Sequence, residues 1–145
     1  MKFLPKVGYN IVIPESVYEE VGNNLSSFVN LKVDSLRGKS LNLAKSLGKL
    51  GIGKGEAECL ALAIKHALDS IICDDRKLVR QIFFSNNKIL KKIKLLGFSF
   101  FLHEFFKKGL IKNIWAAFDL VIDKNNWKRS EVQVANYTFL KGMGY

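Results

Sequence analysis

Carboxylates recur in three separate parts of this sequence. They form the pairs Glu19 and Glu20, Glu56 and Glu58, and Asp74 and Asp75. The last pair follows the apolar run 69–73, which we interpret as a short strand. In open α/β sheets, sites form at the carboxyl ends of strands. Carboxylates that converge there repel one another unless a divalent cation lies between them, so the acids indicate a cation site.

The glycine-rich stretch 48–55 is similar in spacing to a nucleotide-binding P-loop. In such a loop a buried strand comes first and a hydroxyl residue follows the lysine. Here Gly55 follows Lys54, and the preceding segment has helical periodicity. The glycines therefore indicate a tight turn between two helices. A favourable interaction with the helix dipole would explain either Glu56 or Glu58 in the first turn of the second helix. It does not explain why acids recur in the other two segments.

The positive charge is concentrated in the second half of the chain. The formal net charge is +10. The segment from Arg76 to Lys112 contains ten Lys or Arg residues and a single acid, Glu104. Between Pro14 and Asp75 the balance is seven basic to nine acidic residues. A basic surface attracts polyanions, above all nucleic acid, although a merely solubilising face gives the same count.

The remaining residues with reactive side chains are isolated. Cys59 and Cys73 form neither a disulfide framework nor a zinc pattern, and we expect two buried free thiols. His66 and His103 each lie alone in an apolar helical pattern, so we expect no catalytic role for them. The sequence contains no uncharged membrane-length apolar stretch and no signal-peptide pattern, which predicts a cytoplasmic protein without a membrane span.

The order of expected elements predicts one α/β domain over residues 1–145, with a small parallel sheet. We expect strands at 9–13 and 69–73, helices at 14–21, 40–50, 56–68 and 74–84, and a loop with a short extended piece at 23–40. After Ser85 we expect mostly helix, in segments 87–98, 98–111, 113–122 and 128–144, the last with Ser130 as its N-cap.

Four segments resemble the PIN-domain family, in particular prokaryotic VapC-like proteins. They are IPESVYEEV, GKGEAECLALA, IICDDRKLVRQ and GFSFFLHEFFKKGLI, and together they cover most of residues 9–111. The resemblance implies a three-layer α/β fold, with a helical extension from about residue 112. It also implies a metal-dependent toxin-type ribonuclease, with a cognate antitoxin that blocks the site and often a homodimer.

The family's acids carry over to positions in three segments. The resemblance implies Glu20, Glu58 and Asp75 as metal ligands and catalytic residues, with Asp74 adjacent to the last and Glu19 and Glu56 as close alternatives. Glu56 and Glu58 are two residues apart and cannot share a helix face, so only one should reach the metal. The implied cofactor is Mg²⁺ or Mn²⁺, because carboxylates suit these hard cations.

In this interpretation the basic half of the chain holds the RNA backbone. The residues expected to contact it are Arg76, Lys77, Arg80, Lys91 and Lys92. A metal-activated water would then hydrolyse the phosphodiester bond.

One departure from the family leaves a second function open. Family members begin with a strand that bears an Asp, whereas the thirteen residues before Pro14 contain no acid. We therefore expect the first strand and its ligand to be missing, and activity to be in doubt. The alternatives are a catalytically inactive PIN-like module that binds nucleic acid or protein, or an unrelated basic helical module without a parallel sheet.

Overall fold

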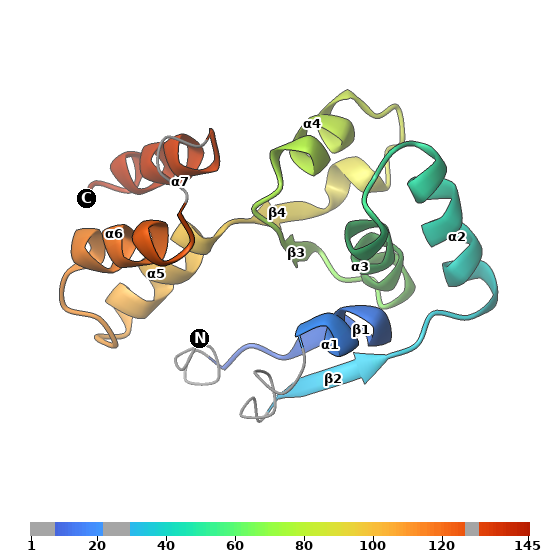
Figure 1. Ribbon diagram of the computed structural model, residues 1–145, viewed down its shortest axis with the longest axis horizontal. Helices are drawn as coiled ribbons and strands as arrows, with labels where there is room; N and C mark the ends of the chain where they lie inside the picture. The colour runs from blue at the N-terminus through green and yellow to red at the C-terminus, as the bar shows by residue number, and fades with distance from the viewer. Residues whose placement is uncertain (1–7, 22–29, 127–130) are drawn as a thin grey trace.

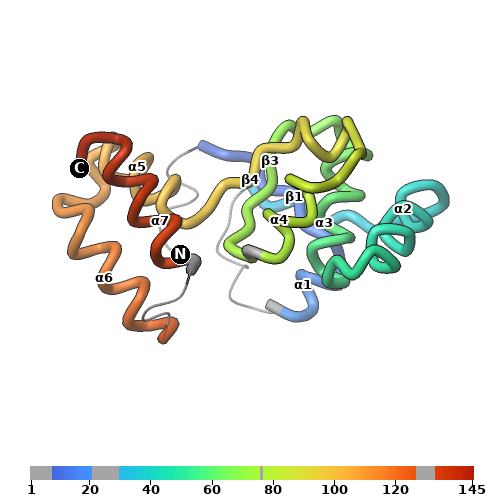
Figure 2. Tube along the Cα trace, turned by 90° about the horizontal axis from the view of Figure 1, so that it is seen from above, coloured from blue at the N-terminus to red at the C-terminus, as the bar shows by residue number. Residues whose placement is uncertain are grey.

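The computed structural model describes residues 8–21, 30–126 and 131–145 (Figure 1; Figure 2). The described helices are α1 (Glu15–Val21), α2 (Gly38–Lys49), α3 (Lys54–Lys65), α4 (Arg76–Phe84), α5 (Phe98–Lys107), α6 (Ile114–Lys124) and α7 (Glu131–Gly142). A 3₁₀ turn, η3, covers Leu90–Lys92. Within these ranges, every helix is too short or too polar to cross a bilayer.

The described strands form two parallel pairs. They are β1 (Ile11–Pro14), β2 (Leu31–Asp34), β3 (Ser70–Ile72) and β4 (Lys94–Leu96). β1 pairs with β2, placing Ile11 opposite Leu31, and β3 pairs with β4, placing Ser70 opposite Lys94. Parallel pairing needs a crossover, which contains α1 in the first case and α4 in the second. The predicted α/β class is thus confirmed, and the unrelated helical module is excluded.

The prediction of a helix over 87–98 is wrong. The side chain of Asn87 accepts hydrogen bonds from the backbone N–H groups of Ile89 and Leu90, at 2.9 and 3.3 Å, and holds a local turn. Only η3 follows, and the chain then extends as β4 along β3. The apolar residues of this segment have a helix-like spacing, but Leu90 and Ile93 reach the core from the 3₁₀ turn and the residue after it. Tertiary pairing has overridden the local pattern.

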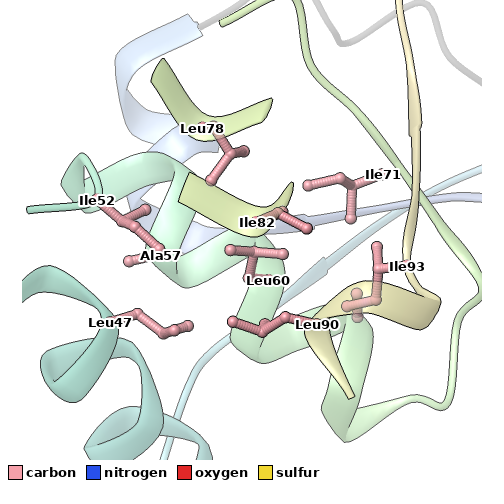
Figure 3. Packing of buried hydrophobic residues seen from close by; sticks show 10 residues of the cluster. Leu47, Ile52, Ala57, Leu60, Ile71, Leu78, Ile82, Leu90 and Ile93 are labelled. Atoms are coloured by element: carbon pink, nitrogen blue, oxygen red, sulfur yellow. The ribbon is translucent and has the colours of Figure 1, made fainter. Parts of the chain in front are cut away.

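The main core surrounds α3. Four consecutive residues of this helix, Leu60 to Ala63, are at most 1% exposed. Figure 3 shows the cluster around Leu60, to which α2, α4, β3 and the η3 region contribute side chains. α3 also contacts both β1 and β3. The prediction of a helix buried on most sides is confirmed, and its alanines allow neighbouring elements to approach closely.

A second group of helices lies beside this core. α5 contacts both α6 and α7, and Figure 1 shows the three together on one side of the molecule. Their apolar side chains form a separate cluster of Leu102, Ile114, Phe118, Ile122 and Leu140. Gly109 follows the last turn of α5 with φ +67°, as expected of the residue after a helix C-cap. The expected N-cap Ser130 lies outside the described residues.

An ionic contact joins β2 to the end of α3. Lys65 Nζ donates to Asp34 Oδ2 at 2.8 Å, and His66 Nε2 lies 2.6 Å from the same oxygen. The hydrogen bond from Lys65, and then that from His66, lower the pKa of Asp34 to about 2. His66 therefore has a structural partner at this position.

We predict that the stability conferred by Asp34 depends on pH in the acid range. A carboxyl whose pKa is lowered on folding stabilises the protein above its unfolded pKa of about 3.9 and loses this effect as the pH falls towards 2. Urea unfolding of the wild type and Asp34→Asn should show a difference in free energy that narrows over that range. A difference that stays constant with pH would contradict the assignment.

We also predict that Leu60→Ala destabilises the protein by about 2–5 kcal/mol, because the side chain is fully buried and leaves a cavity. The matched control is Leu120→Ala on α6, where the leucine is 55% exposed and the change should stay within about 0.5 kcal/mol. Chemical denaturation measures both. Equal effects in the two variants would show that α3 is not the centre of the core.

Candidate functional site

An acidic pocket lies at the carboxyl ends of β1 and β2. Its volume is about 210 Å³, and its described lining consists of Pro14, Glu15, Ser16, Glu19, Ser35, Leu36, Leu41 and Glu58. Three carboxylates therefore share one hollow without a lysine or arginine in that lining. Such a set creates a local negative potential that favours a cation.

Two hydroxyls hold carboxylates of the acidic pocket. Ser16 Oγ donates to Glu58 Oε2, which ties the start of α1 to α3. Ser35 Oγ donates to Glu15 Oε2 at 2.6 Å, across the ends of β1 and β2. The second carboxylate oxygen of each glutamate has no hydrogen bond to these serines and can accept another donor or a cation.

Helix geometry separates the adjacent acids of α1. Glu15 and Glu19 lie four residues apart, on one helix face, and both line the acidic pocket. All three acids of α1 are exposed, but Glu20 is not part of the described lining. The resemblance implies Glu20 as the ligand of this helix, with Glu19 as its alternative, and does not imply Glu15. The i, i+4 spacing of Glu15 and Glu19 was the signal that could have found it.

The two glutamates of α3 have different surroundings. Glu58 lines the acidic pocket. The carboxylate of Glu56 lies over Gly53, the residue before the helix. Glu56 is not part of the described lining of the acidic pocket.

Asp75 caps the helix that follows β3. Its Oδ1 accepts a hydrogen bond from the backbone N–H of Lys77 at 2.7 Å, the usual arrangement at a helix N-terminus. The side chain is exposed, and within the described part of the chain its second carboxylate oxygen accepts no hydrogen bond.

Asp74 connects three segments and lines a second pocket of about 210 Å³, to which Gly97, Ser99 and Asn136 also contribute. Its two oxygens accept from the backbone N–H of Phe98, at 3.1 and 3.2 Å, and Oδ1 also accepts from Asn136 Nδ2 at 3.1 Å. The side chain of Asn136, on α7, in turn accepts from the backbone N–H of Ser99 at 3.1 Å. Asp74 thus holds the start of α5 and the middle of α7 against the end of β3, which is a structural role.

The three predicted metal ligands do not come together as a metal site here. No group of three or more His, Cys, Asp or Glu side chains in residues 8–21, 30–126 and 131–145 could hold a metal ion. Carboxylate oxygens are the donors that Mg²⁺ and Mn²⁺ prefer, but Glu20, Glu58 and Asp75 are not assembled into such a group. The metal-ligand assignment therefore remains a prediction.

The two cysteines are free, as predicted, although each is half-buried rather than fully buried. Burial raises the pKa of Cys59 to about 12 and that of Cys73 to about 11. Both are therefore thiols at neutral pH and unsuited to nucleophilic attack. His103 Nδ1 lies 2.9 Å from the Tyr145 hydroxyl, which gives this histidine a structural partner as well.

The cations expected to bind RNA lie on the surface. Lys77 and Arg80 are exposed on α4, and Lys91 and Lys92 are exposed in η3. In the described part of the chain none of these four forms an ion pair with a carboxylate. The side chain of Arg76 lies outside the described part.

The parallel βαβ crossovers, with acids after the strand ends, define an α/β domain whose candidate site is carboxylate-rich. A family model described as a PIN domain matches residues 1–137. Since the match covers nearly the whole sequence, the chain belongs to the PIN-domain family. No curated protein and no solved structure shows a significant match to it.

We predict that Gly97→Ala destabilises the protein by about 1–3 kcal/mol. A Cβ at Gly97 would lie 2.7 Å from Asn136 Oδ1 and 2.8 Å from Asp74 Oδ1, which hold α5 and α7 in place. Gly48→Ala is the control, because Gly48 lies in α2 with open space around it and alanine favours the helix by about 0.5–1 kcal/mol. Thermal unfolding that gives both variants the same shift would refute this account of Gly97.

Proposed function

We propose that this chain is a metal-dependent endoribonuclease of the toxin–antitoxin, VapC-like type, which hydrolyses RNA phosphodiester bonds. The observation that carries the proposal is the position of the acids in a PIN domain. Glu15, Glu19 and Glu58 surround the carboxyl ends of β1 and β2, and Asp74 and Asp75 follow the carboxyl end of β3. Sites of parallel α/β folds form at this end of the strands.

The charge distribution supports RNA as the substrate class. The acidic pocket has a negative potential suited to a cation, whereas the exposed Lys77, Arg80, Lys91 and Lys92 suit a phosphate backbone. A polyanion could thus be held by one part of the surface while the carboxylates lie beside it.

We propose that Glu58 and Asp75 bind the Mg²⁺ or Mn²⁺, with an acid of α1, Glu19 or Glu20, as a further ligand. When bound, such a cation supplies an activated water and neutralises charge on the phosphate. The chain itself orients Glu58 through Ser16 and fixes Asp75 at the start of α4. In this proposal Asp74 positions the neighbouring helices rather than the substrate.

The same proposal includes a cognate antitoxin that blocks the site and a homodimer in the cytoplasm. An antitoxin that carries cations opposite Glu15, Glu19 and Glu58 would complement the acidic pocket.

The proposal predicts RNA cleavage that requires Mn²⁺ and both key acids. Glu58→Gln retains an oxygen that can accept from Ser16, and Asp75→Asn remains a good helix cap, so both should fold normally. Each should lower the cleavage rate of a labelled RNA roughly 100-fold or more, because a carboxylate ligand is lost. Asp119→Asn, at an exposed acid of α6, should cleave like the wild type.

Two variants separate the roles of the adjacent acids. If Glu19 rather than Glu20 serves the site, Glu19→Gln should lose activity while Glu20→Gln retains it. Cleavage that survives the Glu58→Gln, Asp75→Asn double variant would come from another source and would refute the assignment.

A catalytically inactive RNA- or protein-binding module is the second candidate. It is favoured by one observation, the lack of a three-ligand metal group among the described residues. This candidate predicts no cleavage under any divalent cation and no Mn²⁺ binding by calorimetry. Tight Mn²⁺ binding that disappears in Asp75→Asn would exclude it.

A further inference from the structure

Two adjacent phenylalanines at the end of α4 point into solvent. Phe83 is 72% exposed and Phe84 is 78% exposed, and their ring centroids lie 5.2 Å apart in an edge-to-face arrangement. Phenylalanine is normally buried, and each ring represents a large apolar area. Two rings on one exposed turn therefore indicate a contact surface.

Helical spacing places a cation beside these rings. Leu78 and Ile82, at i and i+4, are buried and define the inner face of α4. Arg80 precedes Phe83 by three residues and Phe84 by four, so it lies next to both on the outer face.

The surrounding segment is uniformly positive. Residues 76–94 contain no acid and seven cations: Arg76, Lys77, Arg80, Lys88, Lys91, Lys92 and Lys94. Of the ones whose side chains are described, Lys94 alone reaches a carboxylate, Asp69 at 3.6 Å. The other described cations of this segment are thus available for an external anion.

Contacts before and after the rings anchor this surface to the rest of the fold. Gln81 Nε2 donates to the carbonyl of Leu50 at 3.2 Å and fixes α4 against the end of α2. After the rings, Leu90 and Ile93 are 2% and 7% exposed and anchor the turn that carries the lysines. A fixed surface pays little ordering cost when it binds a ligand.

We propose that Phe83 and Phe84 form a base-stacking platform for single-stranded RNA, with Arg80, Lys88 and Lys91 on the phosphates. This inference rests on the proposed function and adds to it a binding surface at the end of α4, whose rings lie outside the described lining of the acidic pocket. Proteins bind single strands by stacking bases on aromatic rings beside a positive groove, whereas bases in a duplex are already stacked on one another. The nine residues of α4 span about 13 Å, so a strand on the platform can extend along the helix to Asp75.

Charge argues against a second copy of the chain as the occupant. In a symmetric dimer the same patch faces itself, so the cations of the two copies would be brought together. A polyanion with flat aromatic groups complements both features of the surface, its charge and its rings.

The test is RNA binding in EDTA, measured by fluorescence anisotropy with a labelled oligoadenosine and a matched RNA duplex. We expect Phe83→Ala/Phe84→Ala to bind the single strand at least about 10-fold more weakly. Phe83→Leu/Phe84→Leu should lose as much affinity for the single strand, because leucine is apolar but has no aromatic ring. Phe83→Trp/Phe84→Trp should bind the single strand like the wild type. Leu120→Ala, at an exposed leucine of α6, is the control.

Salt dependence separates the rings from the cations. The phenylalanine variants should leave the slope of log Kd against log salt unchanged, whereas Lys88→Gln/Lys91→Gln, which removes two of the proposed phosphate contacts, should lower it by about 1.4.

Three outcomes would overturn the inference. If the leucine variant binds as tightly as the wild type, the platform fails while the ribonuclease proposal, tested separately by cleavage, stands. If light scattering shows a wild-type dimer that the leucine variant converts to monomer with RNA binding intact, the surface serves self-association. If the wild type neither binds nor cleaves RNA, both proposals fall together.

Discussion

The burial of α3 is the constraint on which the rest of this fold depends. Each described sheet has only two strands, and a pair of strands is marginal on its own in water. α3 contacts both β1 and β3 and presents an almost fully buried run from Leu60 to Ala63. Because both strand pairs pack against α3, the position of Glu58 near the start of this helix is fixed with respect to the ends of the strands. Core packing thereby positions Glu58 beside α1.

The adjacent acids Asp74 and Asp75 have different roles. Asp74 accepts hydrogen bonds from the start of α5 and from Asn136 on α7, so it joins the C-terminal helices to β3. Asp75, one residue later, caps α4 and keeps an oxygen available. Both acids lie between β3 and α4, but Asp75 alone occupies the N-cap position of α4. A structural and a functional carboxylate can therefore be neighbours in sequence, as we propose here.

Much of the fold could be predicted from local sequence patterns. The predictions fail where long-range contacts determine the conformation. The apolar run before Pro14 and the buried character of α3 are visible in the sequence. The strand β4 is not, because Lys94–Leu96 is short and extends only by pairing with β3. For the site, the sequence identified Glu58, which lines the acidic pocket, but not Glu15, whose carboxylate is brought there by a bond from Ser35.

The sequence alone determined the family, the α/β class, the excess of positive charge between Arg76 and Lys112, and the segments that carry acids. These properties are written in residue types and short spacings, which need no knowledge of distant contacts. Only the tertiary structure decided that Glu19 rather than Glu20, and Glu58 rather than Glu56, lines the acidic pocket, and that Phe83 and Phe84 face solvent rather than the core. The reason is physical: a helical spacing gives the faces of a helix, but which face is covered depends on the elements that pack against it.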